Sequence, residues 1–310
     1  EAKMLGCKLY VNGLVGATSE DWFSLKGDKL IGDIRKKREE ITKLFEEIFS
    51  SNHKPSYRDI TVILNAYRRP YNLEAQITSI KGQTYLPKQI WVWVNDHEDL
   101  DGFDFDGLDV DRVIRNDYNW KFYGRFSGAL LADTEYVAIF DDDTIPGDEW
   151  FENCIESMKE KEGIMGAAGY IQTGPAAMQY TREGWPSRNE KLCRVDYVGH
   201  AWFFKREWLS HLWREKPPSW DNSEDIHFSY TAQKYGGIQT YCPPHPPDDT
   251  SQHGSLYGYE LGVDSKATSN NQAVSHQTFF SERDYCIDFS LNGGWKTVNM
   301  VKKGEKNDLE

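Results

Sequence analysis

A regular alternation of apolar runs and amphipathic segments fills the stretch between residues 59 and 140. The apolar runs are rich in β-branched and aromatic residues, as strands are, and each amphipathic segment lies between two of them. This order predicts an α/β fold with a mostly parallel sheet flanked by helices. Strands are expected at 59–67, 89–96, 111–117 and 135–140, and helices at 72–83 and 123–133.

Polar residues follow three of these four expected strands. The first strand runs into NAYRRP, the second ends in ND, and the fourth is followed by DDD. The carboxyl ends of parallel strands lie at one edge of a sheet, and ligands bind beyond that edge in open α/β folds. The sequence therefore predicts a ligand site where these polar residues meet.

Three consecutive carboxylates, Asp141, Asp142 and Asp143, stand directly after the fourth expected strand. Their mutual repulsion has to be offset by solvent, by a helix N-terminus or by a cation. A hard divalent ion takes oxygen ligands and leaves positions for phosphate oxygens, so Mn²⁺ or Mg²⁺ suits this place. The alternative is an acidic turn that caps the helix expected near Trp150.

The strand ending in D-x-D, the preceding strand ending in Asp, and the N-x-Y-x-R loop after the first strand resemble the GT-A glycosyltransferases. The resemblance is greatest to their inverting, family 2-like group and covers about residues 58–250. It implies a GT-A fold, whose nucleotide-binding sheet is followed by an acceptor-binding half. The implied activity is metal-dependent transfer of a hexosyl or pentosyl group from a UDP- or GDP-sugar to a hydroxyl of a glycan or other acceptor.

The resemblance also implies a set of donor-binding residues. Residues of the first loop line the nucleotide pocket, Asp96 accepts a hydrogen bond from the base, and Arg125 faces the diphosphate. Asp141 lies near the ribose. Arg69 and Arg125 have an alternative interpretation as ordinary surface cations. The expected nucleotide-sugar set is Asn65, Tyr67, Arg69, Asp96, Arg125, Asp141 and Asp142.

An inverting transfer needs a carboxylate that takes the proton of the attacking acceptor hydroxyl. The segment SWDNSEDIHFSYTAQKYGG resembles the E-D motif of the acceptor-side helix in these enzymes. Asp225 is therefore the expected base, and Glu224 is the neighbour that could exchange roles with it. An acidic first turn that only caps the helix is the alternative.

The metal and acceptor residues are also implied by the resemblance. Asp143 and Asp141 would hold the ion, with His245 as a further ligand and His253 as the alternate. The segment VDYVGHAWFFKREWL resembles the acceptor floor and places His200 and Trp202 near the sugar. Core packing is the competing interpretation for Trp202.

Composition excludes some other classes of protein. Lys plus Arg is 36 and Asp plus Glu is 49, a net charge of −13, which argues against a general nucleic-acid surface. The five cysteines form no C-x-x-C pair, so a reducing, cytoplasmic location is expected. No apolar run approaches the ~18–20 residues of a membrane span.

Two other functions are alternatives to glycosyl transfer. One is a nucleotidyltransferase acting on sugar phosphates, and the other is a non-catalytic carbohydrate-binding module.

Three parts of the chain are expected. An amphipathic pattern over residues 28–50 predicts a helix within an N-terminal extension, 1–57. A glycosyltransferase domain is expected over 58–300, divided into a nucleotide-sugar half (58–143) and an acceptor half (144–300). A tail, 301–310, follows.

Overall fold

The structure is a computed structural model that describes residues 59–262, 266–267 and 276–307, together with the isolated residues 29, 32, 36 and 37. The chain divides into two compact units, Glu1–Ser56 and Tyr57–Glu310. Most of the helix expected over 28–50 therefore lies outside the described residues.

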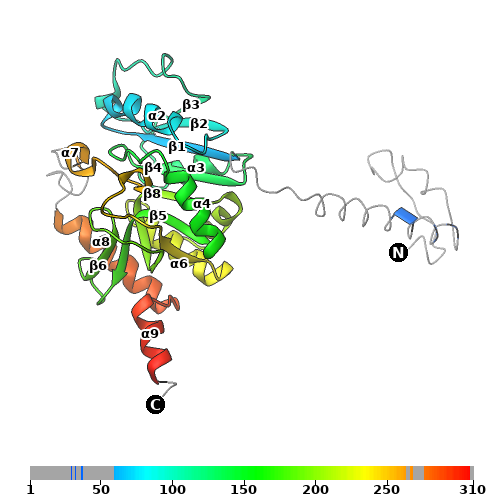
Figure 1. Cartoon of the computed structure of the whole chain (residues 1–310), viewed down its shortest axis with the longest axis vertical. Coiled ribbons are helices and arrows are strands. Elements are labelled where there is room, and N and C mark those ends of the chain that lie inside the picture. Colours follow the sequence, from blue (N-terminus) through cyan, green and yellow to red (C-terminus); the bar gives the residue numbers. More distant parts are fainter. Residues whose placement is uncertain are drawn as a thin grey trace. The chain divides into compact units, whose positions relative to one another are not determined.

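The first half of the second unit is a parallel α/β layer, as the strand–helix alternation predicted (Figure 1). Its strands pair in the order β3-β2-β1-β4, so the order reverses between β1 and β4. This layer consists of strands β1 (Ile60–Ala66), β2 (Gln89–Val94), β3 (Arg112–Arg115) and β4 (Tyr136–Phe140), with helices α2 (Leu73–Lys81) and α3 (Gly124–Ala129).

The second half extends the same sheet with mainly antiparallel strands. The full order is β3-β2-β1-β4-β8-β5-β9-β7, and β6 pairs with β5. The added strands are β5 (Gly163–Gln172), β6 (Tyr180–Gly184), β7 (Cys193–Val195), β8 (Tyr197–Lys205) and β9 (Gln239–Cys242). The added helices are α4 (Trp150–Glu160), α5 (Leu209–Leu212), α6 (Glu224–Gly236), α7 (Gly258–Gly262), α8 (His276–Asn292) and α9 (Val298–Asn307).

Burial explains why these segments form these elements. Strands β1 and β4 are apolar runs whose side chains are almost all buried, as expected for central parallel strands covered on both faces. Helix α4 places Trp150, Phe151 and Ile155 in the same core. The predicted fold class, a mostly parallel nucleotide-side sheet followed by a second half, is therefore confirmed.

The antiparallel pairing of β8 with β4 joins the two halves. Phe140 at the end of β4 pairs with Ala201, and the next backbone N–H, that of Asp141, donates to the carbonyl oxygen of His200 (2.9 Å). This register sets the middle of β8 beside the aspartate run.

Among the described residues, no helix is long and apolar enough to cross a bilayer.

Candidate active site

A pocket of about 450 Å³ lies beyond the carboxyl ends of β1 and β4, where the strand order reverses. Open α/β sheets bind ligands at such a reversal. Residues of both halves line the pocket. Those expected from the sequence are Asn65, Tyr67, Arg69, Arg125, Asp141, Asp142, Asp143, His200, Trp202, Glu224 and Asp225. Asp96, His245 and its alternate His253 do not line the pocket.

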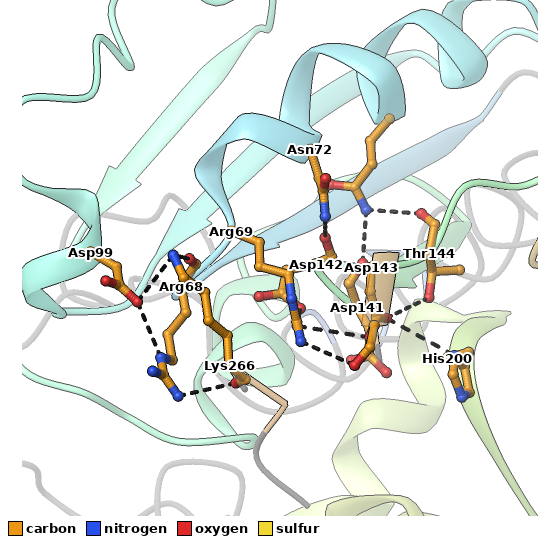
Figure 2. A network of polar contacts seen from close by, with 12 residues as sticks. Arg68, Arg69, Asn72, Asp99, Asp141, Asp142, Asp143, Thr144, His200 and Lys266 are labelled. Atoms are coloured by element: carbon orange, nitrogen blue, oxygen red, sulfur yellow. Dashed lines mark hydrogen bonds and ion pairs between the residues drawn. The ribbon is translucent and has the colours of Figure 1, made fainter. Parts of the chain in front are cut away.

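The loop that carries the three aspartates is held from α2 and the turn before it (Figure 2). The amide of Gln76 donates to the carbonyl oxygens of Asp141 (2.7 Å) and Thr144 (2.9 Å), and the amide of Asn72 donates to that of Asp142 (2.8 Å). These contacts fix the backbone and leave the aspartate side chains facing the pocket.

Two of the three carboxylates pair with buried arginines. Arg125 forms an ion pair with Asp141, and Arg69 donates to Asp142 (2.9 Å). For Asp143 the guanidinium of Arg69 is farther away, at 3.8 Å. Burial, followed by the charges of Asp141 and Asp142, raises the pKa of Asp143 to about 7. A cation at this carboxylate would offset the repulsion.

His200 completes a candidate cation site with Asp141 and Asp143. One ligand atom from each residue lies within 4.8 Å of the others. The Nδ1 atom of His200 is 4.0 Å from Asp143 Oδ1 and is buried with no hydrogen-bond partner among the described residues. Burial lowers the pKa of His200 to about 4, so the imidazole is neutral, the form that ligates metals. The donor set therefore fits a divalent ion.

The structure places His245 and His253 away from this cluster. Nδ1 of His245 lies 2.8 Å from the carbonyl oxygen of Pro243, and its Nε2 accepts from the N–H of Gly254 (3.1 Å). His253 contacts the carbonyl oxygen of Pro246 (2.8 Å). Both histidines are buried, and neither lines the pocket. The histidine that the fold brings to the aspartates is His200.

Asp96 is the other predicted residue that does not line the pocket. It follows β2 and is exposed, whereas its neighbour Asn95 is buried and accepts from Trp93 Nε1 (3.1 Å). Within the pocket, the Oδ1 atom of Asn65 is buried and has no partner in the described part of the chain. Asn65 thus offers a buried acceptor to a bound ligand.

Glu224 and Asp225 begin helix α6 and line the same pocket. Arg125 links them to the aspartates, because its Nη2 donates to Glu224 Oε1 (2.9 Å) while its Nη1 contacts Asp141. Burial raises the pKa of Glu224 to about 7, and the neighbouring Asp225 adds to the shift. Trp202 is buried beneath this bridge, with the Arg125 guanidinium 4.8 Å from its ring centroid.

Asp225 has a partner that the sequence analysis did not include. Arg283 of α8 donates to both of its carboxylate oxygens, at 3.1 and 2.8 Å, and both side chains are largely buried. The pocket also contains Trp185, Tyr259 and Arg182 from the second half. No local motif marks these residues, because each reaches the pocket through pairing or packing of distant segments.

Residues 61–213 match the model of the family described as Glycosyl transferase family 2. This match confirms the resemblance inferred from the motifs. The crystal structure of S. aureus TarS is similar at 15% sequence identity and a TM-score of 0.44, covering 61% of this chain and 37% of that chain. No curated protein matches the chain.

Proposed function

We propose that this glycosyltransferase moves a sugar from a nucleotide-diphosphate donor to a hydroxyl of a glycan or other acceptor, with a divalent ion and with inversion at the sugar. One observation carries the proposal. A single pocket contains both the Asp141, Asp143 and His200 cluster and the Glu224–Asp225 pair.

The ion would be held by Asp141, Asp143 and His200, the cluster whose His200 Nδ1 atom is buried without a partner among the described residues. When bound, it neutralises the charge of the leaving diphosphate. The histidine favours Mn²⁺ over Mg²⁺, because imidazole is a ligand of transition metals whereas Mg²⁺ prefers oxygen.

The donor would lie on the nucleotide side of the pocket. Arg69 and Arg125 are buried cations next to the aspartates and can face phosphate oxygens. The buried acceptor of Asn65 and the ring of Tyr67 suit the nucleoside. Asp142, already neutralised by Arg69, would keep that guanidinium in place.

Asp225 is the proposed general base, and Glu224 is the other candidate. The two hydrogen bonds from Arg283 fix the orientation of the Asp225 carboxylate. Glu224 has one oxygen bonded to Arg125 and a pKa near neutral, which also suits proton transfer. With the diphosphate at the aspartates, an acceptor activated by Asp225 or Glu224 would attack the face of the sugar opposite the diphosphate, which gives inversion.

Incubation with a panel of UDP- and GDP-sugars and Mn²⁺, followed by mass spectrometry, tests this function. Release of free nucleoside diphosphate supports glycosyl transfer, and exchange of pyrophosphate would instead indicate nucleotidyl transfer. Asp143→Asn should abolish most of the release. Asp148→Asn is the matched control, because Asp148 is exposed and lies outside the pocket that holds the cluster.

The choice of base is tested with Asp225→Asn and Glu224→Gln. Loss of the general base should lower turnover by roughly 10²–10⁴-fold while donor binding hardly changes. If neither variant loses more than about tenfold, the base lies elsewhere. A product that retains the anomeric configuration of the donor would contradict the inverting mechanism.

A further inference from the structure

Among the described residues, five basic side chains line the pocket, and four of them have acidic partners. Arg69 pairs with Asp142, Arg125 with Asp141 and Glu224, Lys266 with Asp99, and Arg283 with Asp225. The fifth is Arg182 of β6. In the described part of the chain, no carboxylate lies within ion-pair distance of its guanidinium.

Arg182 is nevertheless held in a defined position. Its Nη2 donates to the hydroxyl of Tyr180 (2.9 Å), and its guanidinium carbon lies 5.0 Å from the ring centroid of Tyr170 and 5.2 Å from that of Tyr180. Arg182 pairs directly with Tyr170 between strands β6 and β5. A guanidinium fixed in this way has most of its five N–H donors left for a ligand.

Two stacked tyrosines lie between Arg182 and Arg283, the arginine that holds the proposed base Asp225. Tyr170 stacks on Tyr197 of β8 with ring centroids 4.8 Å apart and planes 7° from parallel. The guanidinium of Arg283, which holds Asp225, lies over Tyr197 at 5.5 Å. Arg182 and Arg283 therefore flank one pair of stacked tyrosines, on the side of the pocket built by the second half.

We propose that Arg182 binds an anionic group of the acceptor, a phosphate or a carboxylate, and so selects acidic glycans; this rests on the proposed function. Planar guanidinium groups match both oxyanions through paired hydrogen bonds. Tyr180, which is half-buried and lines the pocket beside Arg182, offers a ring to the attached sugar. The acceptor hydroxyl would then lie toward Asp225, and the anionic group toward β6.

Calorimetry in EDTA with three small probes tests the proposal: methyl phosphate, methyl β-glucuronide and the neutral methyl β-glucoside. The wild-type protein should bind at least one anionic probe about tenfold more tightly than the glucoside, because hydrogen bonds to charged groups are the stronger ones. The anion that binds more tightly shows whether the anionic group of the acceptor is a phosphate or a carboxylate. Absence of any anion preference would overturn the proposal.

Arg182→Gln should lose this preference, and Arg188→Gln should keep it. Arg188 is exposed, donates only to the backbone oxygens of Pro186 and Ser187 in the described structure, and does not line the pocket. If Arg182→Gln does not fold, Arg182→Lys takes its place, because lysine keeps the positive charge but lacks the planar guanidinium group with its paired N–H donors. A preference that survives in the folded variant would refute the role of Arg182.

A separate titration with UDP or GDP and Mn²⁺ distinguishes acceptor from donor. Arg182→Gln should leave nucleotide affinity within about twofold of the wild type. If nucleotide binding weakens as much as anion binding does, Arg182 serves the donor diphosphate and the proposal fails. A protein that binds the anions through Arg182 but binds no nucleotide would contradict the proposed function and leave the anion site standing.

Discussion

The contact between Arg283 and Asp225 makes a sharp prediction about stability. Arg283 donates two hydrogen bonds to Asp225, and the side chains are only 13% and 9% exposed. Arg283→Gln would leave a carboxylate largely buried with its charge uncompensated. Removing one partner of a buried pair costs about 3–5 kcal/mol, and the residual exposure of this pair favours the lower end.

The expected loss of about 3 kcal/mol can be measured by urea unfolding followed by circular dichroism. In a unit of this size, each kcal/mol lowers the Tm by about 2–4 °C, so a decrease of about 6–12 °C is expected. Asp225→Asn should also destabilise, because it leaves the Arg283 guanidinium buried without its charged partner. The double variant should then cost clearly less than the sum of the two single changes, because the residues interact directly.

Arg188→Gln is the control for this experiment, and a change within about 0.5 kcal/mol is expected for such an exposed residue. Two results would refute the reasoning. One is a loss below about 1 kcal/mol for Arg283→Gln, which would mean that solvent replaces the lost partner. The other is strict additivity in the double variant, which would mean that the two side chains do not interact in solution.

Three further predictions concern the ion and the pH dependence. His200→Ala should weaken Mn²⁺ binding by at least about tenfold in calorimetry, and an unchanged Kd would remove His200 from the cluster. Gly262→Ala should also weaken it, because the added methyl group would lie 2.3 Å from Asp143 Oδ2; equal affinity would show that α7 adjusts. Burial raises the pKa of Asp196 to about 6, so the folded state binds its proton more tightly than the unfolded chain does. Stability should therefore fall as pH rises between about 4 and 6, by at most ~1.4 kcal/mol per unit, and Asp196→Asn should flatten this slope in urea unfolding at several pH values; an equal slope would contradict it.

The nucleotide side of the fold could be predicted because its information is local. Each strand and helix there is one uninterrupted pattern, and the structure places β1 at Ile60–Ala66 and α2 at Leu73–Lys81 within the expected ranges. Parallel strands run in the same direction, so their carboxyl ends lie at the same edge of the sheet. Asn65, Arg69 and Asp141 could therefore be assigned to one site without any knowledge of side-chain packing.

Asp96 shows the limit of that reasoning. Both faces of β2 are buried, so burial does not alternate along it, and the change from buried to exposed comes just beyond the end of the strand. Here Asn95 takes the buried position and Asp96 the exposed one. The sequence identifies the end of β2 but does not determine which of the two neighbours faces inward.

Long-range pairing accounts for the other differences. His200 reaches the aspartates because β8 lies antiparallel to β4 in one particular register. Arg283 reaches Asp225 because α8 packs against α6. The separation of these residues along the sequence does not predict either contact. A histidine ligand was expected from the resemblance, but only the register could distinguish His200 from His245.

The three aspartates after β4 are tolerated because the structure compensates each one differently. Asp141 contacts Arg125, and that arginine is shared with Glu224 of α6. Asp142 is paired with Arg69. Asp143 has a distant arginine, the Thr144 hydroxyl at 3.3 Å and a pKa near 7. The arginines thus offset the charge of two of the carboxylates, and the third is the one whose charge a metal ion would offset.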